Sequence, residues 1–541
     1  MSAIEYRCGE YMKAVSAIIL FALFGVVQAG KKTDTACGVF DQKPGLKIEL
    51  EITQYEESYK TNELNFGFNV ELGQTAGANG DYYNKNFVQL VSMLMPNALR
   101  YPGGTVSNYF DWTSEKLSEK YVALYANRHI NLLLKRLKKE NHGIVPTASL
   151  ASFSNLTVHH KVKPFIVLNV FESNDNIIKA ISKVKREIES PVYWELGNEV
   201  AYQSYQKNIK LQNGMTWGEE AYLKKIIKIS KYIKDKYPLD KIGVVASEMA
   251  ERRNPKSKST WITESRRESW DKMISSASHY YDAVIVHPYI FASDSFISNV
   301  DVQCLNNIKL DQSEKYKLWI MSNVSNLPSL YIKRLNKRYP GKTIWITEFG
   351  VMDPGGKNIY LKLKKHTGFR VLSTAANYIS WLSEYPKVTT WLTHGLFMGY
   401  DWTHVIFPDY SYTANGVAFK FIQKYLSDID EIAPVLLNGY QATMAVDSFA
   451  GMGMRTIYSI AGRDKKSRAK SFLIVNIANN EINLKLPWRA SSVVTKSFEW
   501  SEKIKPGDYA DLAAFNKYKV DQNNVMLPPR SINLVKSYPT H

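Results

Sequence analysis

The chain has 541 residues, 45% of them hydrophobic and 22% charged, and a formal net charge of +18. This length and composition suit one large domain with a smaller one and exclude a disordered or low-complexity protein. The positive charge favours anionic partners. We predict no nucleic-acid partner because no helix-turn-helix, finger or RNA-binding signature is present. Two explanations of the positive charge remain open. Either the partner is an acidic or sulfated polysaccharide, or the surface is basic for reasons unrelated to the substrate.

The first 29 residues are typical of an export signal. Lys13 precedes the apolar run 14–27, which is too short to span a bilayer comfortably and ends in Gln28-Ala29-Gly30. We therefore predict a signal peptide over 1–29 and a secreted or periplasmic protein. An uncleaved N-terminal anchor is the alternative. After signal removal we expect no membrane span. The oligomeric state stays open.

Strand-like and helix-like segments alternate about eight times between residues 64 and 425. The predicted strands are 65–70, 98–100, 164–170, 193–199, 241–247, 283–286, 343–347 and 388–392. The predicted helices are 82–95, 127–140, 150–159, 176–188, 220–237, 270–277, 327–339, 366–384 and 414–425. Near-continuous apolar strands indicate a parallel sheet covered by helices, and eight repeats favour a (β/α)8 TIM barrel. We expect irregular insertions at 111–146 and 291–325.

The pattern changes from about residue 429. Short alternating stretches separated by turn residues indicate an antiparallel β-sandwich over 429–541. Its predicted strands are 443–446, 455–460, 471–477, 482–486, 493–499 and 531–535. An earlier strand at 46–55 precedes the barrel. We therefore predict that residues 30–60 join the sandwich and that the fold class is α/β, a barrel over 61–428 with a C-terminal β-sandwich domain.

Two of the predicted barrel strands deliver a glutamate near a glycine. Glu199 follows the fourth strand, and Glu348 follows the seventh. The carboxyl ends of barrel strands meet at one rim, so the two side chains should face each other across its mouth. Two carboxylates in this arrangement are the minimum equipment for cleaving a glycosidic bond, and a retaining enzyme needs them roughly 5–5.5 Å apart.

Five motifs carry a resemblance to a known group of enzymes. Trp194–Glu199 resembles the acid/base motif of clan A glycoside hydrolases, and Trp345–Gly350 resembles their nucleophile motif. Leu99–Gly104 and Asn108–Trp112 resemble the second-strand segment of the α-L-arabinofuranosidase and heparanase-like branches. Leu527–Ser531 resembles the end of their sandwich domain.

The resemblance implies a role for several residues. Glu199 would be the general acid/base and Glu348 the nucleophile. Asn198 would bind the sugar 2-hydroxyl, an interaction that strengthens in the transition state. Arg100 would hold the nucleophile ionised because an opposite charge favours the charged form of a carboxyl group.

Other positions admit two interpretations. His287 and Tyr289 end the sixth strand, where clan members place a His or Tyr near the nucleophile, but His287 is equally compatible with a satisfied core histidine. Trp391 on the eighth strand is either a sugar platform or a core residue. Glu195 lies on the same face of its strand as Glu199 but deeper, so we predict a structural role, with a basic partner as one possibility.

These observations predict a secreted retaining glycoside hydrolase that acts on a polysaccharide or a derived oligosaccharide by double displacement, without a cofactor. We expect no catalytic metal because His159, His160 and His279 lack metal-ligand spacing. The charge favours a uronic-acid or sulfated substrate. One alternative is an α-L-arabinofuranosidase-like hydrolase of neutral plant or algal glycans, and another is a non-catalytic carbohydrate-binding barrel.

Overall fold

The computed structural model describes residues 48–55, 58–70, 82, 85–118, 149–202, 216–247, 262–291, 312–352, 368–393, 395–397, 403–406, 411–439, 455–478, 481–486, 490–499, 516–518 and 524–539. The predicted signal peptide, the predicted helix at 127–140 and the predicted strand at 443–446 lie outside these residues. Most of the two predicted insertions lies outside them as well. Within the described ranges, no helix combines the length and hydrophobicity that crossing a bilayer requires.

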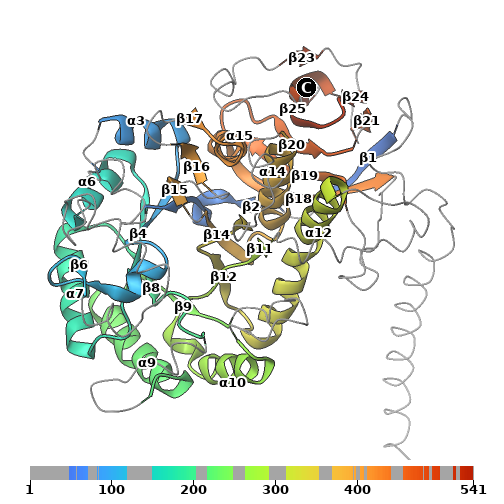
Figure 1. Ribbon diagram of the computed structural model, residues 1–541. Coiled ribbons are helices and arrows are strands. Elements are labelled where there is room, and N and C mark those ends of the chain that lie inside the picture. The colour runs from blue at the N-terminus through green and yellow to red at the C-terminus, as the bar shows by residue number, and fades with distance from the viewer. Residues whose placement is uncertain are drawn as a thin grey trace, which may run out of the picture.

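Eight parallel strands form a closed barrel, which confirms the predicted TIM barrel (Figure 1). Each strand pairs with the next, and the last pairs with the first. In chain order the strands are β3 (Asn65–Asn69), β4 (Ala98–Tyr101), β7 (Lys163–Leu168), β8 (Tyr193–Leu196), β9 (Lys241–Val245), β10 (Ala283–Val286), β12 (Thr343–Ile346) and β14 (Val388–Thr393). β8 is therefore the fourth barrel strand and β12 the seventh.

Helices surround the barrel. They are α3 (Lys85–Leu94), α6 (Leu150–His160), α7 (Asn174–Glu187), α9 (Glu219–Lys236), α10 (Glu264–Ser275), α12 (Gln312–Arg338), α14 (Gly368–Leu382) and α15 (Ala414–Asp428). In α7 the Ser173 side chain accepts a hydrogen bond from the backbone N–H of Asn176 and so caps the helix. Apolar residues that recur every three or four positions in α7 are buried, which is why the sequence period located this helix.

Helix α12 corrects a predicted boundary. We expected a helix over 327–339, but α12 starts at Gln312 and contains Pro328, which removes one backbone hydrogen bond of the helix. Ile320 and Val324, in the turns before the proline, are fully buried. Burial of this apolar face outweighs the backbone hydrogen bond that the proline cannot make. Residues 312–325 of the predicted insertion are therefore helix.

The smaller elements lie between these helices and strands. They are the 3-10 helices η1 (Thr61–Glu63), η3 (Thr105–Tyr109) and η4 (Ser278–Tyr280), the hairpin of β5 (Phe110–Asp111) and β6 (Lys116–Leu117), and the three-stranded sheet of β15 (Gly395–Phe397), β16 (Thr403–Ile406) and β17 (Ser411–Tyr412). A parallel pair, β11 (Tyr289–Phe291) with β13 (Gly350–Met352), follows β10 and β12 at the carboxyl end of the barrel.

The C-terminal region forms the predicted β-sandwich from one ten-stranded sheet. Its main path runs β23 (Asn516–Tyr518), β22 (Ala490–Glu499), β25 (Ser531–Pro539), β20 (Lys470–Asn476), β19 (Ile457–Asp464), β18 (Ile429–Gly439), β1 (Ile48–Tyr55), β21 (Ile482–Lys485), β24 (Asn524–Leu527), and β2 (Tyr59–Lys60) pairs with β18. Apolar side chains from both ends of the path, such as Phe472 and Leu484, share one core, so the sheet folds over on itself. β1 pairs antiparallel with β18 and parallel with β21, which joins the two ends of the chain.

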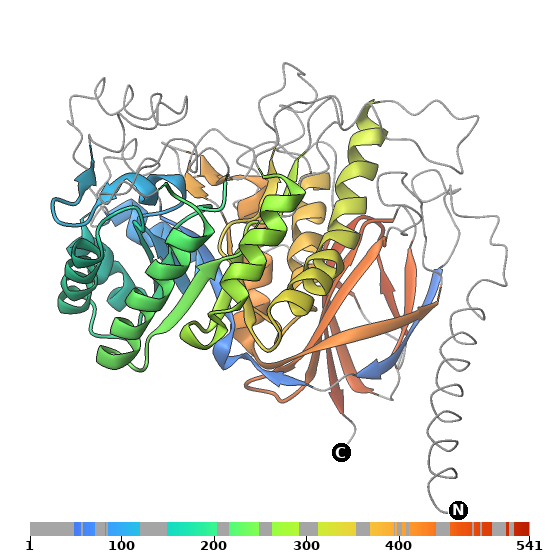
Figure 2. The ribbon, with the colours of Figure 1, turned by 90° about the horizontal axis from the view of Figure 1, so that it is seen from below.

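The barrel and the sandwich share a packed boundary (Figure 2). One continuous apolar core runs from the barrel helices into the sheet. The Tyr425 hydroxyl on α15 donates to the carbonyl of Ser471 on β20 at 3.0 Å. The hydroxyls of Ser325 on α12 and Tyr458 on β19 lie 2.7 Å apart. The sandwich therefore packs against the helix that precedes strand seven of the barrel and the helix that follows strand eight.

Candidate active site

Glu199 and Glu348 lie at the carboxyl rim of the barrel, after β8 and β12. A carboxylate oxygen of each and a ring nitrogen of His287 all lie within 4.8 Å of one another. Barrel closure produces this proximity, because the two glutamates are far apart in the sequence. The rim therefore holds two carboxylates at a separation that one sugar ring can bridge.

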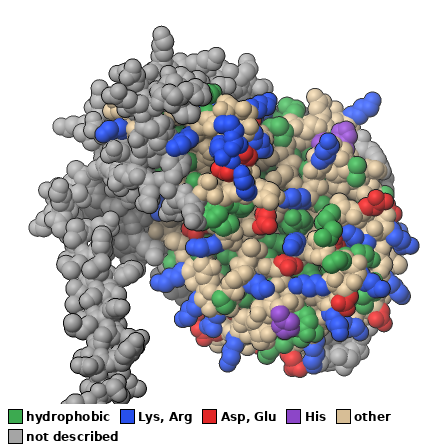
Figure 3. All heavy atoms as spheres, turned by 180° about the vertical axis from the view of Figure 1, so that it is seen from behind, with side chains coloured by type: hydrophobic (Ala, Val, Ile, Leu, Met, Phe, Trp, Pro, Cys, Tyr) green, Lys and Arg blue, Asp and Glu red, His purple; other side chains and the backbone are tan. Residues whose placement is uncertain are grey.

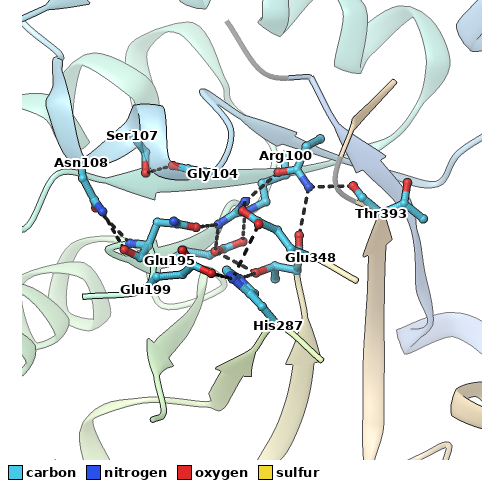
Figure 4. A network of polar contacts seen from close by, with 12 residues as sticks. Arg100, Gly104, Ser107, Asn108, Glu195, Glu199, His287, Glu348 and Thr393 are labelled. Carbon is cyan, nitrogen blue, oxygen red and sulfur yellow. Dashed lines mark hydrogen bonds and ion pairs between the residues drawn. The ribbon is translucent and has the colours of Figure 1, made fainter. Parts of the chain in front are cut away.

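Arg100 on β4 is fully buried and contacts the rim carboxylate Glu348 (Figure 4). Its Nε and Nη2 donate to the two carboxylate oxygens of Glu195, each at 2.9 Å. The remaining N–H groups donate to Asn69, Glu348 and Asn198 at 2.7, 2.7 and 2.8 Å. All five N–H donors of the guanidinium are thus used by protein acceptors.

The charge of Arg100 is secured by the same carboxylates. Burial alone lowers its pKa, but Glu195 and Glu348 outweigh that effect and raise the pKa above its ordinary value. A buried cation with two carboxylates stabilises the ionised form of both. Glu195 is therefore the structural partner of Arg100, in line with the role predicted for it.

Glu348 is the more enclosed of the two rim carboxylates. Its Oε1 accepts from Arg100, and its Oε2 accepts from the Tyr289 hydroxyl at 2.6 Å. Burial, and then the charges of Glu348 and Glu199, raise the pKa of Tyr289 well above its ordinary value. Tyr289 therefore stays protonated and keeps donating. The backbone of Gly104 closes the other side, since a Cβ atom added there would lie 2.3 Å from Glu348 Oε1.

Glu199 sits on a tight turn. Its φ is +50°, and that of Gly197 is +88°, a left-handed region that glycine adopts without strain. Tyr202 donates a hydrogen bond to Glu199 Oε1 at 3.0 Å. His287 Nδ1 lies 3.2 Å from the same oxygen. This turn places the carboxyl group above the strand end, where its side chain is 13% exposed.

The side-chain amide of Asn198 has its oxygen bound and its nitrogen available. Its Oδ1 accepts from Arg100, and its backbone N–H donates to Asn108. Its Nδ2 is buried and has no hydrogen-bond partner in the described part of the chain. An unpartnered donor at a rim between two carboxylates suits a ligand oxygen, because buried polar groups are otherwise paired.

The structure brings six of the seven predicted site residues together and places the seventh elsewhere. Glu199, Glu348, Asn198, Arg100, His287 and Tyr289 form one network. Trp391 is fully buried, and its ring packs against Tyr385 in the layer between barrel and helices. Its neighbour Leu392 fills the barrel interior, so the alternation of β14 turns Trp391 outward. The prediction of a sugar platform at Trp391 is therefore wrong.

Several members of the network were not predicted as site residues. Asn69 donates to the backbone carbonyls of Thr347 and Thr393, and Thr347 joins Glu195 to His287. Asn69 ends the first barrel strand, a position that signals a rim residue. Nothing in the sequence signals the hydroxyl of Thr347, because its role depends on partners from other strands.

Three side chains whose oxygen and nitrogen atoms converge could also hold a metal ion. Among the described residues, Glu199, His287 and Glu348 form such a group. Both ring nitrogens of His287 already have partners, in Glu199 and in Thr347. The contacts among the three residues are thus accounted for by hydrogen bonds.

The closed barrel with the sandwich joined to it is also the fold of several solved glycoside hydrolases. Three solved structures with this fold illustrate the likeness. The family 51 arabinofuranosidase from Xanthomonas axonopodis pv. citri is 14% identical, covers 91% of this chain and 99% of its own, and has a TM-score of 0.62. The α-L-arabinofuranosidase from Thermotoga maritima, solved as an arabinose complex, is 12% identical, covers 91% and 99%, and has a TM-score of 0.61.

The third is the family 44 xyloglucanase from Paenibacillus polymyxa, solved with xyloglucan. It is 11% identical, covers 91% of this chain and 100% of its own, and has a TM-score of 0.55. No family model and no curated protein matches the sequence. The structural likeness concerns the fold, and this fold is the one that the motifs implied.

Proposed function

We propose that this protein is a retaining glycoside hydrolase. The observation that carries the proposal is the pair Glu199 and Glu348, in which one carboxylate oxygen of each lies within 4.8 Å of the other. Retaining enzymes hold their two carboxyl groups roughly 5–5.5 Å apart, whereas inverting enzymes leave a wider gap for water. The unequal surroundings of the two groups support different roles for them.

Glu348 is the nucleophile in this proposal. Arg100 and Tyr289 both donate to it, which stabilises the carboxylate that attacks the anomeric carbon. Glu199 protonates the leaving oxygen as the glycosidic bond breaks, so a glycosyl ester of Glu348 forms. Glu199 then takes a proton from water, and the resulting hydroxide displaces Glu348 from the anomeric carbon. Asn198 Nδ2 is placed to donate to the sugar 2-hydroxyl.

For the substrate we propose an anionic polysaccharide or an oligosaccharide derived from one. The net charge of +18 supports it. On the face seen in Figure 3, Lys and Arg side chains are spread widely, with Asp and Glu between them. A neutral arabinofuranoside is the second candidate, supported by the arabinofuranosidases of similar fold. The five donors of Arg100 are occupied, so this cation is not available to an anionic sugar.

We also propose that the enzyme is exported, because of the signal predicted at 1–29. The N-terminal sequence of the mature protein tests this.

Substitution of the nucleophile tests the reaction. We expect Glu348→Gln to lose at least about a thousandfold in hydrolysis of aryl glycosides and polysaccharides, while binding persists. Glu199→Ala should spare kcat/KM on substrates with activated phenol leaving groups, whose first step needs no protonation, and azide should then trap the slowly hydrolysed intermediate as a glycosyl azide of retained configuration. Glu220→Gln, on the exposed face of α9, is the matched control and should be fully active.

Two outcomes would overturn the proposal. Turnover by Glu348→Gln at the wild-type rate would remove the nucleophile assignment. Binding of glycans by a wild-type protein that hydrolyses none of them would instead indicate a non-catalytic carbohydrate-binding barrel.

A further inference from the structure

We propose that Thr347 and Glu195 fix the tautomer of His287, so that its Nδ1 presents a lone pair to Glu199 and keeps the catalytic proton there. The inference rests on the proposed function and adds two positioning residues to it. Its basis is a chain of four side chains, one on β8 and three directly after β8, β10 and β12, in which each hydrogen bond dictates the direction of the next. Figure 4 shows three of them, Glu195, His287 and Glu199.

The chain starts at Glu195, which is fully buried. Both of its oxygens accept from Arg100, and an ionised carboxylate accepts hydrogen bonds only. The Thr347 hydroxyl lies 3.2 Å from Glu195 Oε2 and must therefore donate to it. A hydroxyl has a single proton, so toward any further partner Thr347 acts as an acceptor.

The next link is His287. Its Nε2 lies 3.0 Å from Thr347 Oγ1 and must carry the proton, since that oxygen accepts there. A neutral imidazole has one N–H, which leaves the lone pair on Nδ1. If Thr347 donated to His287 instead, Glu195, which forms a buried ion pair with Arg100, would lose the Thr347 proton. The charged end of the chain therefore sets the tautomer.

The last link is the contact with Glu199. Nδ1 lies 3.2 Å from Glu199 Oε1, a distance at which two lone pairs repel unless a proton lies between them. Glu348 Oε2 is farther from Nδ1, at 3.7 Å, and is occupied by the Tyr289 hydroxyl. The proton therefore sits between Glu199 and His287, and the Tyr202 hydroxyl donates to the same oxygen of Glu199.

This arrangement serves both halves of the reaction. In the first, the glycosidic oxygen replaces Nδ1 as the acceptor of the Glu199 proton. Glu199 is then a carboxylate that faces the lone pair of Nδ1 and receives no hydrogen bond from it, so this oxygen can accept the proton of the attacking water. An Nδ1–H tautomer would instead stabilise that carboxylate and oppose both steps.

The test replaces the Thr347 hydroxyl without changing its shape. Thr347→Val removes the hydroxyl, Thr347→Ala repeats the loss should valine impair folding, and Thr347→Ser is the control that keeps it. ¹⁵N NMR of histidine-labelled protein reports which ring nitrogen carries the proton, and His287→Gln assigns the signal among the ten histidines. We expect the Nε2–H tautomer in the wild type and Thr347→Ser, and a shift toward Nδ1–H in the other two.

Kinetics give the second readout. Thr347→Val should lose about tenfold or more in kcat/KM on aryl glycosides with poor leaving groups, whose first step needs the proton, and stay within about twofold in kcat/KM on dinitrophenyl glycosides, whose first step does not. Thr347→Ser should restore the first activity. An Nδ1–H tautomer in the wild type, an unchanged tautomer in Thr347→Val, or equal losses on both substrates would overturn the inference. If the wild type hydrolyses no glycoside, the proposed function fails, while the NMR result still decides the tautomer.

Discussion

At the scale of single residues, the rim depends on close approach as much as on chemical groups. Arg100 and Tyr289 hold Glu348 from two sides, and Gly104 closes the third. The φ of Gly104 is −72°, so it lies outside the left-handed region that favours glycine. The restriction comes from the carboxylate oxygen that occupies the space a side chain would need.

Gly104→Ala should therefore impair catalysis more than folding. The added methyl would meet Glu348 Oε1, so the carboxylate must move away from Arg100. We expect a fall of at least about tenfold in kcat, because a displacement of about 1 Å can cost a hundredfold. Gly218→Ala is the control, since a Cβ there meets nothing within 4 Å. Full activity of Gly104→Ala would show that Glu348 is not held against this backbone.

At the scale of elements, the β19–β20 hairpin depends on a buried acid. Asp464 Oδ1 accepts from the backbone N–H groups of Lys466 and Ser467, and Oδ2 accepts from Lys536 on β25 at 2.5 Å. Burial alone raises the pKa of Asp464, but Lys536 and the donors of Ser467 outweigh it and hold the pKa well below its usual range. The hairpin turn is thus tied to a neighbouring strand by one ionised group.

Asp464→Asn should lower the free energy of unfolding by about 2 kcal/mol near pH 7. The ionised form is favoured in the folded protein, so its stabilisation is present above the unfolded pKa and is lost as the pH falls through the folded one. The gap between variant and wild type should shrink below about pH 4 in urea melts. Asp428→Asn, which removes an exposed (i, i+4) pair with Lys424, should change stability by less than about 0.5 kcal/mol. A gap independent of pH would contradict the assigned cause.

At the scale of the whole molecule, the excess of positive charge is the feature that bears on the substrate. Its field extends about 10 Å at 0.1 M salt and only about 3 Å at 1 M. If the field attracts an anionic polymer, kcat/KM on uronic or sulfated polysaccharides should fall several-fold between about 0.05 and 0.5 M salt, because added salt shortens the screening length. Hydrolysis of a neutral aryl α-L-arabinofuranoside should stay constant in the same buffers. Equal activity on neutral glycans without any salt effect would contradict the anionic substrate.

The sequence by itself determined the barrel, the sandwich and the two rim glutamates. These follow from local signals, because apolar periodicity reports which face of a segment is buried and a carboxylate after a barrel strand must lie at the rim. The same local signals misplaced the start of α12, where burial of an apolar face overrides the proline.

Only the tertiary structure decided what the glutamates touch. Arg100 contacts Glu195 and Glu348 because barrel closure brings these residues together, although they lie 95 and 248 positions further along the sequence. The outward turn of Trp391 depends on the register of β14 against β3. The donor direction through Thr347 depends on a carboxylate from another strand. Such contacts arise between segments distant in sequence, and no local pattern of residues encodes them.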